Sequence, residues 1–185
     1  DVVHALPAVS TLKASFPEIH KVPMISGQGA KFIAASLAAY KKGDRKHPTM
    51  RAIAVSLTEQ DIADLSAFYE QHGGKAAASA PPDGVPTASP EVTTLLTKGA
   101  CASCHGANYS KPIDGSYPKI AGQHADYLYV ALKSYKTEAN PQVGRNNAIM
   151  GGQVKQFTLP ELKAMAAYLS SLPGEMRTVK EPYFR

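Results

Sequence analysis

The chain has 185 residues, of which 44% are hydrophobic, and a formal net charge of +5 at pH 7. This length suffices for one large or two small domains, and no apolar run approaches the roughly 20 residues that a transmembrane helix needs. The basic residues form no cluster of the kind that binds nucleic acid, so we expect neither a membrane span nor a nucleic-acid-binding protein.

The first half of the chain predicts helices and no strands. After Gly27-Gln28, the segment 31–42 carries apolar residues with the period of an amphipathic helix. A later helix begins at residues 58–61, whose sequence Thr-Glu-Gln-Asp has the form of a capping box. That helix ends before Gly73-Gly74, because two glycines in succession break a helix.

Residues 75–90 are predicted to form a linker. They are rich in proline, alanine and glycine, a composition that cannot bury an apolar face and that favours a semi-extended chain. The linker separates residues 1–74 from residues 91–185, and we expect each of these segments to form a domain.

The only two cysteines of the chain lie in the sequence Cys101-Ala-Ser-Cys104-His105. Two thiols three positions apart, followed directly by a histidine, form the attachment pattern of a c-type haem. The thiols add to the two vinyl groups of the porphyrin, and the histidine lies under the iron as its proximal ligand. A thioredoxin-like redox pair would need a preceding strand, and a zinc site would need a second ligand pair. We therefore predict one covalent haem c, with His105 bound to its iron.

The sixth iron ligand is expected to be a methionine of the second half. Met165 lies within the apolar stripe of a helix, where methionine usually fills a core, and Met176 lies in the tail. Met150 precedes Gly151-Gly152 in a segment predicted to be a loop that reaches over a flat cofactor. We predict Met150 as the distal ligand, which favours ferrous iron and raises the potential relative to a second histidine.

The two halves are predicted to be copies of one another. At an offset of 95 the second half repeats a Pro-x-x-x-Gly-Gln segment and the helix behind it, which predicts a helix at 127–136. At an offset of 100 it repeats an Arg-to-Met segment and a capped last helix that starts at residues 158–161 and ends before Pro173-Gly174. The aligned positions include Pro23 with Pro118, Ile25 with Ile120, Gln28 with Gln123, Tyr40 with Tyr135, Arg45 with Arg145, Met50 with Met150 and Phe68 with Tyr168. So many pairs with a single insertion indicate an internal duplication.

These motifs resemble class I cytochromes c and, more narrowly, the two-domain and usually di-haem cytochromes of the c4 type from bacterial periplasms. The resemblance implies an all-α fold of two tandem cytochrome c-like domains joined by the linker. It also implies electron shuttling to terminal oxidases or from dehydrogenases. The candidate cofactor-binding residues are Cys101, Cys104, His105, Met150, Pro118, Ile120, Gln123, Tyr127 and Arg145.

Two of these candidates have alternative roles. Arg145, five positions before Met150, could reach a haem propionate, but its counterpart Arg45 in the cysteine-free half shows that it could equally be structural. Gln123 stands at a helix start and could contact a propionate, cap the helix or serve the fold alone.

The first half departs from the family because it has no cysteine. We therefore expect residues 1–74 to form a degenerate cytochrome c-like domain without covalent haem. Its Met50 is a candidate ligand for a non-covalent haem or a copper ion, together with His4, His20 or His47. The simpler hypothesis is that Met50 packs in an apolar core.

We expect a one-electron carrier without catalysis of its own, acting in the periplasm, since bacteria attach haem covalently outside the cytoplasm. The first residues show no signal peptide, which predicts a mature exported form. The alternative is a cytochrome subunit of a larger dehydrogenase or oxidase complex, with the haem-free domain as a docking module. A haem enzyme or gas sensor is disfavoured because Met150 would fill the sixth position.

The partners are expected to be redox proteins with an acidic docking surface. The basic side chains predicted to face them are Lys111, Lys119 and Lys155. The tail 175–185 is expected either to pack across the domain boundary or to bind a partner.

Overall fold

The computed structural model describes residues 22–72, 84–137 and 140–177. Within them the chain is mostly helical, and its only strands are two short ones. The elements are α2 (Ala30–Lys42), β1 (Arg45–Lys46), α3 (Pro48–Ser56), α4 (Glu59–Gln71), α5 (Pro90–Lys98), α6 (Cys101–His105), α7 (Ala125–Ser134), β2 (Gly144–Arg145), α8 (Ala148–Lys155) and α9 (Leu159–Ser171).

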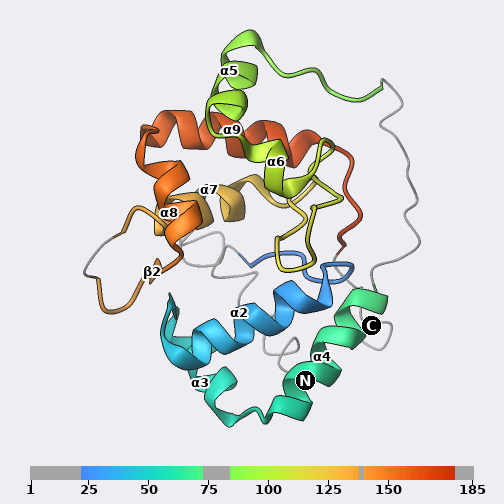
Figure 1. Ribbon diagram of the computed structural model, residues 1–185, viewed down its shortest axis with the longest axis vertical. Helices are drawn as coiled ribbons and strands as arrows, with labels where there is room; N and C mark the ends of the chain where they lie inside the picture. Colours follow the sequence, from blue (N-terminus) through green and yellow to red (C-terminus); the bar gives the residue numbers. More distant parts are fainter. Residues whose placement is uncertain (1–21, 73–83, 138–139, 178–185) are drawn as a thin grey trace, which may run out of the picture.

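The helices form two groups that follow the two halves of the sequence. In the first group α2 packs against α3 and α4, and in the second α7 and α5 both pack against α9. Figure 1 shows the first group, coloured blue to teal, below the second group, coloured green to red. This arrangement confirms the expected all-α fold of two tandem helical units.

The helices predicted from the sequence are confirmed within two residues at each end. The segment 31–42 corresponds to α2, and 127–136 corresponds to α7. Both capping boxes are formed, since the hydroxyls of Thr58 and Thr158 accept hydrogen bonds from the backbone N–H groups three residues later. These two caps start α4 and α9 at equivalent positions of the two halves.

The linker prediction overlaps the start of α5. Ser89 caps this helix by accepting a 3.2 Å hydrogen bond from the backbone N–H of Val92. Pro90 then fits the first turn, where its missing N–H costs nothing. The last predicted linker residue therefore begins a helix of the second half.

The last helices of the two halves differ in how much of their apolar stripe is buried. In α9, Leu162 is fully buried and Met165 nearly so, because α5 and α7 cover this helix. In α4, Leu65 and Phe68 are 36% and 49% exposed. The apolar stripe of α4 is therefore more exposed than that of α9.

The two strands were not predicted from the sequence. They pair antiparallel across the two halves, with Arg45 opposite Arg145 and Lys46 opposite Gly144. Each strand is only two residues long, which is too short for an alternating pattern to show. Their pairing brings equivalent residues of the two copies together.

Candidate functional site

The two cysteines and the histidine of the motif form the short helix α6. The helix starts after Ala100, whose φ of 46° is in the left-handed region, and ends at Gly106 with a φ of 81°. A Cβ on Gly106 would collide with the carbonyl group of Lys111, so only glycine suits this turn. Cys101 and Cys104 are free, half-buried thiols on this helix.

The imidazole of His105 is held in one orientation by Pro118. Its Nδ1 lies 2.9 Å from the carbonyl oxygen of Pro118. Because a carbonyl can only accept, Nδ1 carries the proton and Nε2 keeps its lone pair. His105 is only 6% exposed, and this burial lowers its pKa although the hydrogen bond to Pro118 acts in the opposite direction. A neutral imidazole with an unprotonated Nε2 is the form that binds a metal.

Met150 lies in the first turn of α8 rather than in the loop predicted from the sequence. Asn147 caps this helix, and its side-chain oxygen accepts a 2.9 Å hydrogen bond from the backbone N–H of Met150. Met150, Ile120 and Cys101 are all half-buried and pack against the same apolar core of the second half. The fold therefore brings these three predicted cofactor contacts onto one core.

Tyr127 and Arg145 lie together where the two halves meet. Arg145 donates to the hydroxyl of Tyr127 at 3.1 Å, and Arg45 of the first half donates to the same oxygen at 2.8 Å. Burial alone would raise the pKa of Tyr127, but the two adjacent positive charges and their hydrogen bonds lower it to about 8. Sequence analysis missed Arg45 as part of this site because only folding brings it here.

Gln123 bonds to the other half rather than capping α7 with its side chain. Its side-chain oxygen accepts from the backbone N–H of Met24 at 2.9 Å, and its Nε2 donates to the Met24 carbonyl at 2.8 Å. Gln28 makes the equivalent pair of hydrogen bonds with the backbone of Lys119, at 2.9 and 3.0 Å. Since 24 and 28 correspond to 119 and 123 in the duplication, this pair, which we call the glutamine clamp, is symmetric.

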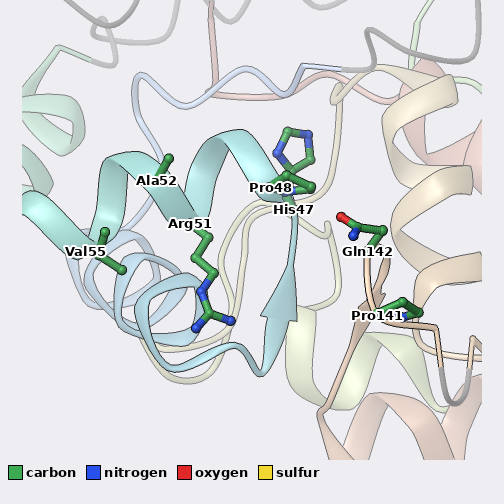
Figure 2. A pocket seen from close by; sticks show the side chains of 7 residues that line it. All are labelled: His47, Pro48, Arg51, Ala52, Val55, Pro141 and Gln142. Atoms are coloured by element: carbon green, nitrogen blue, oxygen red, sulfur yellow. The ribbon is translucent and has the colours of Figure 1, made fainter.

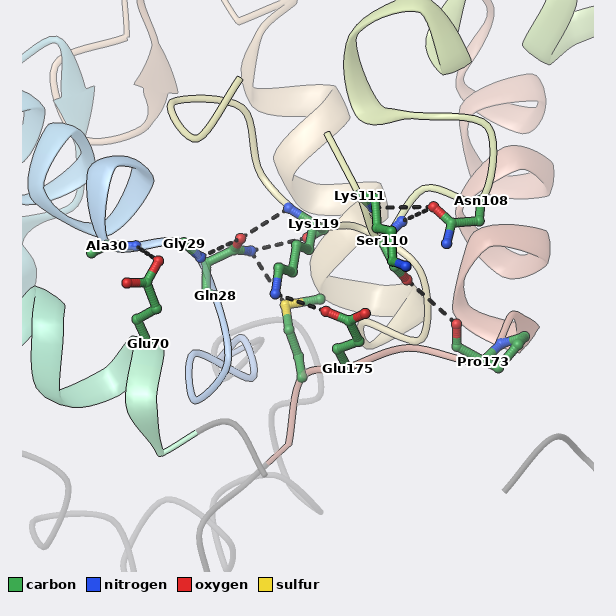
Figure 3. A network of polar contacts seen from close by, with 11 residues as sticks. Gln28, Gly29, Ala30, Glu70, Asn108, Ser110, Lys111, Lys119, Pro173 and Glu175 are labelled. Carbon is green, nitrogen blue, oxygen red and sulfur yellow. Dashed lines mark hydrogen bonds and ion pairs between the residues drawn. The ribbon is translucent and has the colours of Figure 1, made fainter. Parts of the chain in front are cut away.

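The tail beyond α9 packs across the boundary between the halves, which was one of its two expected roles. The sulfur of Met176 lies 3.2 Å from the amide nitrogen of Gln28, and Glu175 forms a 2.8 Å ion pair with Lys119 (Figure 3). Arg177 pairs with Ser26 through its backbone. Lys119 is therefore engaged in an ion pair within the protein, and its role in docking a partner stays a prediction. The residues after 177 lie outside the described part of the chain.

His47 has a structural role next to Met50. Its Nδ1 accepts a 3.3 Å hydrogen bond from the backbone N–H of Met50 and caps α3, as Asn147 caps α8. His47 also lines a hollow of about 450 Å³ between α3 and the segment that leads to β2 (Figure 2). Met50 does not line this hollow. Of the other histidines proposed as partners of Met50, His4 and His20 lie outside the described residues.

Comparison with known proteins agrees with this geometry. The family model "Cytochrome c" matches residues 91–173. Cytochrome c-553 from Nitratidesulfovibrio vulgaris is 40% identical over 73 residues, which are 40% of this chain and 70% of the relative. The chain belongs to the cytochrome c family. As a cytochrome c it is an electron-transfer haem protein rather than an enzyme.

Two solved structures resemble this cytochrome along both halves. Cytochrome c4 from Acidithiobacillus ferrooxidans is 26% identical, with a TM-score of 0.64, and the match covers 82% of this chain and 89% of that one. Thiosulfate dehydrogenase from Marichromatium purpuratum is 26% identical, with a TM-score of 0.63, and the match covers 83% of this chain and 33% of that one. The cytochrome is thus of the class I, c4 type.

The donor set of this cytochrome suits a covalent haem. Two free thiols lie on one short helix, and the histidine that follows them presents Nε2, which no hydrogen bond between described residues uses. No group of three or more His, Cys, Asp or Glu side chains with the spacing of a metal site occurs among the described residues.

Proposed function

We propose that this cytochrome is a one-electron carrier with a single haem c, attached through Cys101 and Cys104. His105 would bind the iron through Nε2, and Met150 would bind it from the other side. The hydrogen bond from His105 Nδ1 to the carbonyl of Pro118 is the observation that carries this proposal. It leaves the imidazole neutral, fixed and ready to coordinate.

The protein's own residues then have distinct tasks. The haem supplies the one-electron chemistry of its iron, and the chain holds it, excludes water and sets its potential. Pro118 orients His105 and makes the imidazole a better donor through the shared proton. The apolar core behind Cys101, Ile120 and Met150 lowers the local dielectric, which is one of the levers that set a haem potential.

The number of haems per chain tests this proposal directly. The protein is denatured in alkaline pyridine, and its haem spectrum and intact mass are recorded. One haem that stays bound to the denatured chain is the expected result, and it is lost in Cys101→Ser/Cys104→Ser. Two covalent haems, or none, would contradict the proposal.

A second candidate function is supported by the likeness to thiosulfate dehydrogenase from Marichromatium purpuratum, of which this chain spans a third. In this alternative the cytochrome is the electron-accepting subunit of a larger complex, and its cysteine-free half is a docking module. The two functions differ in the native mass of the protein purified from its own organism. A free carrier elutes with the mass of the chain plus haem, whereas a subunit elutes with its enzyme.

We further propose a periplasmic location, supported by the need to attach haem outside the cytoplasm. No helix among the described residues is long and apolar enough to cross a membrane. Exposed lysines such as Lys111 and Lys155 would meet an acidic redox partner. If so, the rate of electron transfer falls as added salt screens the encounter.

A further inference from the structure

Two arginine side chains face each other at the boundary between the halves. Arg45 and Arg145 are directly opposite in the β1–β2 pair, and both donate to the hydroxyl of Tyr127. Like charges held this close repel one another, which raises the free energy of the folded state unless an anion lies nearby. Among the described residues, no carboxylate forms an ion pair with either guanidinium group.

The hydrogen-bonding capacity of these arginines is also incompletely used. The Nε atom of Arg45 is buried and has no hydrogen-bond partner among the described residues. Buried polar atoms are almost always paired, so an unpaired N–H donor indicates a missing acceptor. The lowered pKa of Tyr127 points in the same direction, because it shows how strongly the two positive charges favour a negative group here.

This arginine pair is connected to the proposed haem site. Arg145 lies over the ring of Tyr135 at 5.4 Å, and Tyr135 packs against the same core as Met150 and Cys101. Arg145 therefore contacts a tyrosine that packs on the same apolar core as Cys101 and Met150, two of the residues proposed to hold the haem. The anionic groups of a haem are its propionates, which need pairing when they are taken out of water.

We infer that Arg45 of the cysteine-free half pairs with a propionate of the haem that the other half binds. Arg145 pairs with the same propionate. This inference rests on the proposed function. The first half would then act on the haem electrostatically. The ferric haem carries one more positive charge than the ferrous haem, so a nearby positive charge disfavours the ferric state. Arg45 is thus a residue that raises the reduction potential of a haem bound by another domain.

The rest of the boundary is built to hold Arg45 in place. Its Nη1 donates to Ser36 at 2.9 Å, and its guanidinium lies 4.6 Å from the centre of the Tyr40 ring. The glutamine clamp keeps the two halves in register at a second point, through the backbones of Met24 and Lys119. A mobile surface arginine would need none of these contacts, so their presence favours a fixed electrostatic role.

The test is to measure the reduction potential of the haem-loaded protein with Arg45→Gln, and with Arg51→Gln as the matched control. Arg51 is an exposed arginine of α3 in the same half, so its loss changes the net charge equally. We expect Arg45→Gln to lower the potential and Arg51→Gln to leave it near the wild-type value. The difference should largely persist at high salt, because the half-buried charge of Arg45 is screened less than an exposed one.

A further variant and the haem count of the wild type distinguish a failure of this inference from a failure of the proposed function. Arg45→Lys keeps the charge and should restore most of the potential, which distinguishes an electrostatic role from a structural one. Equal potentials for Arg45→Gln and Arg51→Gln would overturn the inference, as would a shift that appears only with one buffer anion, since that indicates a solution ion instead of a propionate. The haem count of the wild type tests the proposed function separately: a wild type without covalent haem refutes that function, whereas one haem with unshifted potentials refutes only the inference.

Discussion

Met150 and Met50 occupy equivalent places in the two copies, yet we expect different behaviour from them. Each lies in the first turn of a short helix, and its backbone N–H is bound by the capping side chain three residues earlier, Asn147 or His47. The surroundings differ, because only Met150 lies in the half that contains Cys101 and His105. We therefore expect the role of iron ligand to depend on the presence of His105 in the same half and not on the local conformation of the methionine.

We predict that Met150→Ala abolishes the weak far-red sulfur-to-iron band of the ferric protein and lowers its reduction potential. A thioether stabilises ferrous iron, and its loss leaves water or another donor in its place. Met50→Ala is the matched control and should change neither property. Loss of the band in Met50→Ala alone would show that the ligand has been assigned to the wrong half.

Gly106 is required by the turn that ends α6. Its φ of 81° is in the left-handed region, and a Cβ would strike the carbonyl group of Lys111. We predict that Gly106→Ala lowers the free energy of unfolding by about 2 kcal/mol or more, from the unfavourable φ and the collision together. Covalent haem yield should fall with it, because the same turn sets the position of His105.

The control for this prediction is Gly152→Ala. Gly152 lies within α8, and a Cβ there meets no atom within 4 Å. Alanine is the better helix former by about 1 kcal/mol, so this variant should be as stable as the wild type or more so in urea denaturation. Equal destabilisation by the two variants would contradict the role given to Gly106.

The capping boxes decide where the last helix of each half begins. In α9 the hydroxyl of Thr158 accepts from the backbone of Glu161, whose carboxylate accepts in turn from the backbone N–H and hydroxyl of Thr158. These hydrogen bonds lower the pKa of Glu161. Thr58 and Asp61 form the same arrangement at the start of α4.

We predict that Thr158→Ala destabilises the protein by about 1 kcal/mol, the usual cost of removing a cap. Because the pKa of Glu161 is lower in the folded state, the stabilisation is complete above the pKa of the unfolded chain and is lost as the pH falls through the folded value. Denaturation as a function of pH should therefore show a smaller loss of stability on the acid side in Thr158→Ala. An unchanged pH profile would show that the box contributes nothing.

The predictions from the sequence differ most from the structure at the short elements α3, α8, β1 and β2. The helices have nine and eight residues, and each follows a residue, His47 or Asn147, that caps it through a side-chain hydrogen bond. An apolar period needs a longer segment to be distinguished, so the region around Met150 was predicted to be a loop. The long helices α2, α4, α7 and α9 have that length, and their sequences predicted them correctly.

The glutamine clamp joins the two halves through equivalent residues. We expect it to make the two halves unfold together. Gln28 binds the backbone N–H and carbonyl of Lys119, and Gln123 binds those of Met24. Both glutamine side chains are buried, at 4% and 2% exposure. Removing one leaves two backbone groups without their partners at the boundary.

We predict that Gln28→Leu lowers the free energy of unfolding by about 1–3 kcal/mol for each unpaired group that it leaves buried. The unfolding transition should also become broader or split in two, as the first half separates from the second. Gln60→Leu, at an exposed position on α4, serves as the control. A single unshifted transition in Gln28→Leu would mean that the clamp does not couple the halves.

The sequence by itself sufficed to predict the covalent haem attachment that we propose, and it determined the long helices of this protein. Cysteine spacing is a local property, and Cys101, Cys104 and His105 are close in space because they are close in the chain. Amphipathic period and capping boxes are local too, since they depend on residues within one or two turns. The duplication followed from comparing one half with the other.

Only the tertiary structure decided what the equivalent residues of the two halves do to each other. The meeting of Arg45 with Tyr127, the glutamine clamp and the ion pair of Lys119 join residues that are 56 to 99 positions apart. No local pattern encodes such contacts, because they join segments that are far apart in the sequence and meet only in the folded chain. The sequence identified Arg45 and Gln28 as copies of Arg145 and Gln123; their positions in space show that each serves the opposite half.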